Sequence, residues 1–282
     1  MAKIVLTEGV SQIAQTIIKT FSEAEIPLTV LVDTSVYTTD AHPYITYQPI
    51  DWLNPQEWER HLNGAEYVIF NVHSKMFNSS LWHGYRSDLR RLIGQFVRCC
   101  TPRHIIELTL KKEVPIFTEA EIYALPKSYF FSNSNVHTET ASSLQAMQVR
   151  ATDTPATLLK AYATYLRKVT CGLIEIRDWP QQYNIYLKGT QRPLIAMHPQ
   201  TMHAVEGIQL HILPEGLLTK DVSSSSMSFL FTKVSPTELQ TLLYRYESAL
   251  PWWLYLCTQA VIHDAVMAGF GRWLRVYRSP KD

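Results

Sequence analysis

The chain has 282 residues, of which 46% are apolar and 18% are charged, and its formal net charge is +1 at pH 7. This length and apolar content are enough for one large or two modest globular domains with a hydrophobic core. The nearly neutral charge provides no bulk field that would attract nucleic acid, so we expect no nucleic-acid partner.

Cysteines and the first residues indicate the cellular setting. Cys99, Cys100, Cys171 and Cys257 show no metal-ligand spacing, and the adjacent pair is unsuited to an ordinary structural disulfide. We therefore expect free, buried thiols and no metal site. Polar residues from Glu8 onward interrupt the first apolar run, which argues against a secretory signal and for a cytoplasmic protein.

A strand, a turn and a helix open the chain. Residues 3–6 form an apolar run typical of a buried strand, and Ile13, Ile17 and Phe21 recur at helical spacing after it. The intervening turn contains one glycine, Gly9. This order of elements is the frame in which dinucleotide-binding folds hold a cofactor phosphate.

Alternating strands and helices continue from there. Residues 28–32 predict a second strand that ends at Asp33, where an NAD-type fold keeps the acid that holds the ribose hydroxyls. A solvated acid at a strand end is the equally weighted alternative. Residues 44–47 and 65–73 predict further strands, and Asn54 caps an intervening helix that has proline at its first position. The pattern predicts a doubly wound parallel sheet.

The remaining elements extend this α/β pattern. We expect a Rossmann-like core over residues 1–177, a smaller substrate-type region over 178–248, and a C-terminal amphipathic helix within 249–282. The letters from Ser235 to Glu238 match a helix start, with a cap, a proline and a capping-box glutamate. Other elements are expected at residues 89–97, 103–109, 154–168, 172–177, 182–187, 193–197 and 208–213.

The segment from residue 250 to 278 combines aromatic residues with a basic end. Trp252 and Trp253 begin an amphipathic pattern, and Arg272 and Arg275 follow it. Polar residues interrupt the segment too early for a membrane span. We expect it to dock on the core or on a second subunit, and the alternative is a segment lying on a membrane surface.

The first turn resembles the T-G-x-x-G-x-x-G turn of the extended short-chain dehydrogenase/reductase family. Glu8, Ser11 and Ala14 stand where the three glycines of that family belong. Those glycines allow a tight turn and close approach of the backbone to pyrophosphate. A carboxylate beside pyrophosphate would repel it by about 1 to 4 kcal/mol. We therefore expect no cofactor, and if a nucleotide does bind, Gly9, Ser11, Asp33 and Asp51 are the expected contacts.

A second stretch carries the same resemblance. Residues 51–74, DWLNPQEWERHLNGAEYVIFNVHS, resemble the family segment that supplies the adenine-side acid and the strand beside the nicotinamide. Asp51 matches that acid. His73 stands among the residues that replace the small residues ending this strand, and it is a candidate acid or base. A structural hydrogen-bonding histidine is the more common outcome at a strand end.

Catalytic residues of the family are only partly matched. Thr109 stands where the family keeps its serine, and its hydroxyl can polarise a carbonyl. Tyr123 and Lys127 fit the Tyr-x-x-x-Lys spacing, but Pro126 lies within the turn that must be helical. In the helix expected at 154–168, Lys160 aligns with the lysine, whereas an alanine replaces the tyrosine.

Three functions remain open from the sequence. The first is a family-like protein that has lost hydride transfer and acts as a binding, regulatory or assembly subunit, with a small-molecule or protein partner. The second is an active NAD(P)-dependent reductase, epimerase or dehydratase with an atypical site, and the third is a non-redox enzyme in which His73 or Tyr123 carries protons. The resemblance covers residues 3–248, and the first function explains the motif losses together. A membrane-peripheral location and a homo-oligomer through residues 250–278 stay open as well.

Overall fold

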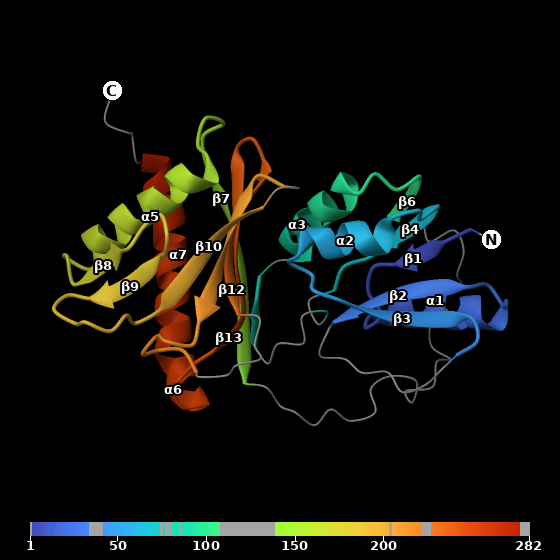
Figure 1. The fold of residues 1–282 in the computed structure, drawn as a ribbon, viewed down its shortest axis with the longest axis horizontal. Helices are drawn as coiled ribbons and strands as arrows, with labels where there is room; N and C mark the ends of the chain where they lie inside the picture. Colours follow the sequence, from blue (N-terminus) through green and yellow to red (C-terminus); the bar gives the residue numbers. More distant parts are fainter. Residues whose placement is uncertain are drawn as a thin grey trace. The chain divides into compact units, whose positions relative to one another are not determined.

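The computed structural model describes residues 2–33, 42–73, 76, 81–84, 86–107, 139–202, 205–220 and 227–276. The chain forms two compact units (Figure 1). The first unit comprises residues 1–78 and 89–137, and the second comprises residues 79–88 and 138–282. Residues 139–177, which the sequence pattern grouped with the Rossmann-like core, are thus part of the second unit.

The first unit contains a parallel sheet of five strands in the order β3-β2-β1-β4-β6. This is the Rossmann-like order in which the chain starts in the middle of the sheet and crosses over to both sides. The predicted parallel α/β core is therefore confirmed. The strands are β1 (Ile4–Leu6), β2 (Leu28–Asp33), β3 (Ile45–Ile50), β4 (Tyr67–Phe70) and β6 (His104–Glu107).

Three helices accompany this sheet: α1 (Gln12–Glu23), α2 (Pro55–Leu62) and α3 (Arg86–Cys99), whose first residues are part of the second unit. Ala14 and Ile17 on α1 are buried against Leu6 and Val30 of the sheet. Gly9 is required by packing, because a Cβ built on it would lie 2.9 Å from Val30 Cγ1. The close approach of the turn to β2 thus explains the one glycine kept there.

Helix α2 begins as predicted. The side chain of Asn54 accepts a hydrogen bond from the Gln56 amide at 3.0 Å, and Pro55 stands in the first turn. Trp52 and Trp58 pack with ring centroids 5.5 Å apart, and both are fully buried. The indole of Trp52 donates to the carbonyl of Met76 at 2.9 Å, which fixes the segment after β4 to the start of α2.

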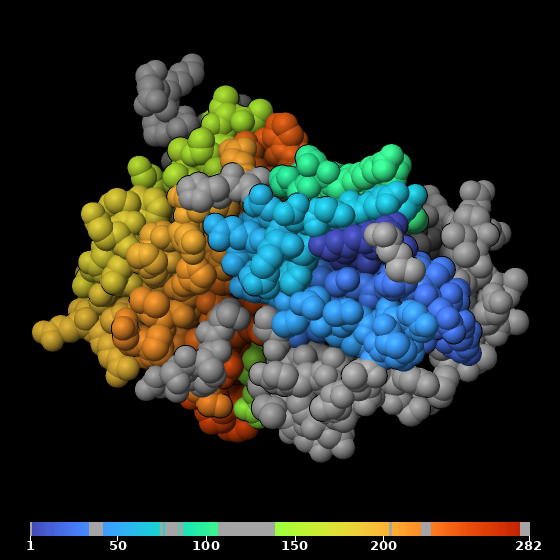
Figure 2. Space-filling model, turned by 45° about the vertical axis from the view of Figure 1, so that its right-hand side comes forward, coloured from blue at the N-terminus to red at the C-terminus, as the bar shows by residue number. Residues whose placement is uncertain are grey.

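The second unit is built on a six-stranded sheet in the order β10-β11-β12-β13-β7-β5. Neighbouring strands are antiparallel except for the parallel pair β5 and β7. The strands are β5 (Leu81–His83), β7 (Thr140–Gln148), β10 (Ala196–Met202), β11 (Gly207–Leu213), β12 (Ser228–Ser235) and β13 (Glu238–Glu247). A separate antiparallel pair, β8 (Ile174–Arg177) with β9 (Asn184–Leu187), is seen in yellow at the surface in Figure 2.

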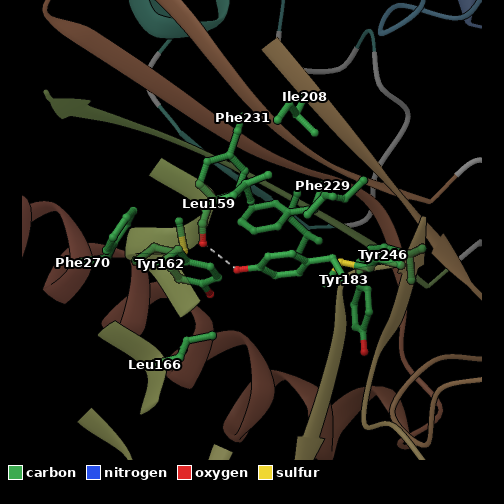
Figure 3. Close-up of a cluster of buried hydrophobic side chains, with 14 of the residues drawn as sticks. Leu159, Tyr162, Leu166, Tyr183, Ile208, Phe229, Phe231, Tyr246 and Phe270 are labelled. Atoms are coloured by element: carbon green, nitrogen blue, oxygen red, sulfur yellow. Dashed lines mark hydrogen bonds between the residues drawn. The ribbon is translucent and has the colours of Figure 1, made fainter. Parts of the chain in front are cut away.

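One face of the six-stranded sheet is covered by α5 (Pro155–Val169) and α7 (Gln259–Val276), which follows the short helix α6 (Trp252–Cys257). Their contact is an aromatic core (Figure 3), in which the ring of Tyr162 lies 5.0 Å from that of Phe270 and 5.8 Å from that of Phe231. The predicted amphipathic C-terminal segment thus docks on the core of its own unit. No helix in the described ranges is long and apolar enough to cross a membrane.

One sequence prediction is wrong in the second unit. Ser235 and Glu238 do not start a helix; they pair across a two-residue turn that joins β12 to β13. The alternating pattern that follows supplies the reason, since Leu239 and Leu243 of β13 face the aromatic core and Gln240 and Leu242 alternate with them toward the other face. Serine and proline, which favour the start of a helix, are also common in turns.

The thiols are free as expected, but the prediction that they are buried is wrong. Cys99, Cys171 and Cys257 are exposed, and Cys100 is intermediate. Each of the exposed thiols lies at or just after the end of a helix, where side chains turn to solvent.

Candidate functional site

The turn between β1 and α1 is the candidate site because its amides stand where a Rossmann-like sheet receives phosphate. Here the carboxylate of Glu8, which is fully buried, accepts hydrogen bonds from these amides. The Val10 amide donates to Glu8 Oε2 at 2.7 Å, and the Ser11 amide donates to the same oxygen at 2.9 Å. An anion belonging to the chain itself is therefore bound at the first turn of α1.

The other carboxylate oxygen of Glu8 is held by two side chains. The Ser11 hydroxyl and the Asn71 side-chain amide both donate to Glu8 Oε1. The Asn71 amide also donates to Ser11 Oγ at 2.9 Å, and Ser11 Oγ accepts from the Ala14 amide at 3.1 Å as the cap of α1. Four donors thus satisfy one buried carboxylate, as burial of a charge requires.

Asn71 is brought to this cluster by the parallel pairing of β1 with β4. Thr7 completes the connection, because its hydroxyl donates to the Asn71 carbonyl at 2.6 Å and accepts from the Asn71 amide at 2.9 Å. The sequence analysis missed both residues. Their positions were the available signal. Thr7 directly follows the apolar run of β1, Asn71 directly follows that of β4, and these two parallel strands end at the same edge of the sheet.

The cluster also changes the interpretation of Glu8. The sequence predicted a carboxylate that repels an incoming phosphate. In the structure the carboxylate instead takes the backbone and side-chain donors that a phosphate would use, and the Ser11 side chain fills the adjoining space. Occupation of the donors adds to electrostatic repulsion as an obstacle to dinucleotide binding.

Three other predicted residues lie in the first unit. Asp33 ends β2 and is buried, with 3% of its surface exposed. Asp51 is half-buried, and its Oδ1 accepts from the Leu53 amide at 3.0 Å, so it shapes the turn before α2. His73 is half-buried after β4, and its carbonyl accepts from the Met76 amide at 3.1 Å.

The remaining predicted catalytic residues are not among the described residues of the first unit. Thr109 and Tyr123 lie outside the described residues. Lys160 lies in the second unit, exposed on α5, where it lines a shallow pocket of about 210 Å³ with Arg150 and Asp153.

The tyrosines near Lys160 have a packing role. Tyr162 and Tyr165 are buried in the aromatic core. Burial raises the pKa of both phenols above the ordinary value, and for Tyr162 the neighbouring Tyr165 adds to the rise. A raised pKa is the opposite of what a catalytic phenol requires for proton transfer near neutral pH. Within the described ranges, no group of three or more metal-ligating side chains is assembled.

Comparison with known proteins adds one distant similarity. No family model matches the chain, and no curated protein matches it. A solved Rossmann-fold NAD(P)-binding family protein from Shigella flexneri is similar with 15% sequence identity and a TM-score of 0.29. The match covers 37% of this chain and 50% of that one, so it spans half of the other protein's length. The strand order of the first unit defines the class: an α/β protein with a Rossmann-like sheet.

Proposed function

We propose that this chain is a Rossmann-like protein that has lost ordinary hydride-transfer chemistry and acts as a binding, regulatory or assembly subunit. The observation that carries the proposal is the buried Glu8 carboxylate, which accepts hydrogen bonds from the amides of Val10 and Ser11. Nucleotide-binding relatives of this fold use the corresponding donors for pyrophosphate.

Displacing this internal anion would be costly. Phosphate binding would require Glu8 to leave four donors, two of them side chains, and to be accommodated elsewhere. Separating a buried charge from its partners costs about 3 to 5 kcal/mol, which corresponds to a loss of affinity of more than a hundredfold. This penalty supports the absence of a resident NAD(P) at the turn.

The direct test is titration of the purified protein with NADH and NADPH, followed by calorimetry and by nucleotide fluorescence. We expect no saturable binding up to millimolar concentration. A dissociation constant in the micromolar range would overturn the proposal. Mass spectrometry of ligands retained on the purified protein should likewise find no dinucleotide.

A glycine variant tests whether Glu8 is the cause. Glu8→Gly removes the internal acceptor and frees the amides of Val10 and Ser11. We expect this variant, if it remains folded by circular dichroism, to bind ADP more tightly than the parent protein. Equal, negligible ADP binding by both proteins would assign the loss of binding to another part of the site.

Asp33 supports an alternative function. Its position at the end of β2 is the one from which an acid holds the ribose of NAD in this fold. The alternative is an NAD(P)-dependent reductase, epimerase or dehydratase, or a non-redox enzyme that reuses the same cleft. Micromolar NADH binding that Asp33→Ala abolishes would favour the NAD(P)-dependent enzyme.

Exposed apolar side chains on the last two helices support an assembly role. Trp253 on α6 is 68% exposed, and Val261 and Ile262 at the start of α7 are 59% and 61% exposed. Apolar surface that remains after the helices have packed on their own unit is typical of interaction sites. We expect a homo-oligomer in sedimentation that Ile262→Glu dissociates. Vesicle binding lost in the same variant would instead favour a peripheral membrane contact.

A further inference from the structure

The second unit leaves part of one sheet edge open. Strand β5 pairs with β7 from Leu81 to His83, opposite residues 141–143. From Leu144 onward, no strand in the described ranges pairs with β7 on this side, whereas β13 pairs with it along the other side. Ala146 and Gln148 are exposed, so the edge is accessible to solvent. An open edge is a template on which another extended chain can pair.

The open edge presents main-chain donors and acceptors. In an antiparallel pair, successive residues direct their amide and carbonyl groups to opposite sides of the strand. The amide of Val149 donates to the carbonyl of Thr237 at 2.9 Å, on the side of β13. Because the register is continuous up to this point, the main-chain groups of Leu144, Ala146 and Gln148 face away from β13. They form a row that a further strand can use.

A groove of about 860 Å³ runs between this edge and helix α7, and the described residues that line it are all in the second unit. Its volume is within the range of ligand-binding sites. Met147 of β7 and Met267 of α7 are buried and contribute apolar surface, and methionine side chains adapt to different partners. A Cβ built on Gly271 would lie 3.3 Å from Met147 Cγ, so α7 packs closely against β7 at this point.

Gln145 presents an unused acceptor at the wall of the groove. Its side-chain nitrogen donates to Asp264 Oδ1 at 3.2 Å, and a carboxylate can only accept, which fixes the orientation of the amide. The other amide atom, Gln145 Oε1, is buried and has no hydrogen-bond partner in the described part of the chain. A buried acceptor without a donor is unfavourable, and a ligand in the groove can supply the donor.

Arg272 and Arg275 bring positive charge to the groove. They lie three residues apart on α7, on one face of the helix, and both are exposed. No ion pair among the described residues involves either guanidinium. Asp88 and Asp264 also line the groove, but Asp264 precedes Arg272 by eight residues, about 12 Å along the helix. The end of the groove near the arginines is therefore the place for an acidic group.

We propose that this groove binds an extended acidic segment of a partner protein, which adds to the edge of β7 as a further strand. Main-chain pairing supplies affinity in this mode of recognition, and pockets for alternate side chains select the sequence. A serine or threonine opposite Gln145 would donate to its Oε1. The next position on the same face lies opposite Met147, beside Gly271 and the arginines, and would hold aspartate or glutamate.

A second copy of this chain fits the groove less well than a separate segment does. If two β7 edges paired antiparallel about Ala146, residue 149 of the second copy would fall opposite Ser143. His83 of β5 already pairs with Ser143 there. A segment that ends or bends before this point avoids the obstruction, and so we expect a flexible stretch of a partner protein.

The experiment is calorimetric titration of the full chain with two capped synthetic peptides, acetyl-Val-Thr-Val-Glu-Val-amide and acetyl-Val-Glu-Val-Thr-Val-amide, one for each strand direction. We expect saturable sub-millimolar binding of one of them. Lysine in place of glutamate should weaken this binding by about tenfold or more. Absence of saturable binding by both peptides, or equal affinity for the lysine version, would overturn the proposal.

Methylated peptides test whether the bound segment forms a strand. Two versions of the bound peptide, N-methylated at alternate sets of amides, differ in whether the methyl groups face β7. We expect one version to lose binding, because its amides can no longer donate to the edge. Full binding of both versions would exclude strand addition.

Arg275→Glu tests the charge. The matched control is Arg167→Glu, which makes the same exchange at an exposed position in the last turn of α5, as Arg275 is in the last turn of α7. We expect the Arg275 variant to bind the glutamate peptide at least about tenfold more weakly and the Arg167 variant to bind it like the parent protein. Equal affinity in both variants would refute the assignment. Self-association that Arg275→Glu abolishes, without peptide binding, would assign the groove to a second copy and overturn the proposal.

Gln145→Met tests the selection of a hydroxyl. The parent protein should prefer the threonine peptide over the same peptide with valine by several-fold, and the variant should lose this preference. An unchanged preference would contradict the role of Gln145. The groove does not rest on the proposed function, since Glu8 is in the first unit. Micromolar NADH binding would overturn that function and leave the peptide result unaffected.

Discussion

The side-chain amide of Asn71, at the end of β4, donates to the carboxylate of Glu8, which precedes it by 63 residues at the end of β1. Exchange of this amide for a carboxylate should be severe although the shape hardly changes. Asn71→Asp removes a donor and sets a like charge against Glu8, and we expect a loss of about 3 to 5 kcal/mol of unfolding free energy in urea titrations. Asn63→Asp, at the exposed end of α2, is the matched control. Similar losses in both variants would contradict the importance of the cluster.

His61 predicts a pH dependence of stability. Burial and the adjacent Arg60 hold its pKa below the usual value of 6.5, against smaller opposite effects of Glu57 and the Pro49 carbonyl. Between the lowered folded value and 6.5, the folded protein binds fewer protons than the unfolded chain. Unfolding free energy should therefore fall as the pH drops from 6.5 toward the folded pKa, and this contribution should not change further below it.

The effect can be isolated with one substitution. His61→Gln should remove this part of the pH dependence, which is worth about 1.4 kcal/mol for each unit by which the pKa is lowered. Urea unfolding near neutral pH and in mild acid provides the measurement. His198→Gln, at an exposed position, controls for the loss of a histidine. An unchanged pH profile in the His61 variant would exclude this residue as the source.

The docking of α7 makes a quantitative prediction. Phe270 is fully buried and contacts both Tyr162 and Tyr165, with ring centroids 5.0 Å and 5.5 Å away. Phe270→Ala should cost about 3 to 5 kcal/mol of unfolding free energy because it leaves a cavity in the aromatic core. Trp253→Ala, at a side chain that is 68% exposed, should stay within about 0.5 kcal/mol in the monomer. Equal costs would mean that α7 is not anchored through Phe270.

Lys160 provides a test of the family resemblance. Its side chain is exposed on α5 in the second unit. Lys160→Ala should change unfolding free energy by less than about 0.5 kcal/mol and should leave any activity intact. A large loss of activity with unchanged stability would instead restore Lys160 as a catalytic residue.

Local patterns in the sequence were enough to predict much of the fold. Apolar runs and helical spacing predicted the opening strand and helix. The adjacent residues Asn54 and Pro55 predicted the capped start of α2. The failures concern information that is not local. Ser235 to Glu238 satisfies the rules for a helix start, and only the pairing of β13 with β12 and β7 decides for a turn.

The candidate site shows the same limit. Glu8 was singled out because it replaces a glycine, but its partner Asn71 is distant in sequence and becomes a neighbour only through the sheet. Lys160 was aligned correctly as part of a helix, yet helical periodicity cannot tell which sheet the helix covers. The contact of α5 with β11 and β12 settles that question for the structure.

Strand β5 has a consequence for how this polypeptide is made. It is part of the second unit, yet the chain passes through it at residues 79–88 and then returns to the first unit until residue 137. A ribosome therefore exports β5 well before its partner β7 exists, and a nascent chain halted near residue 137 carries an unpaired edge strand. Such a fragment is a natural target for chaperones or for aggregation. Because each unit is made of two separate stretches of the chain, dividing the polypeptide at any single position leaves neither unit with all of its residues.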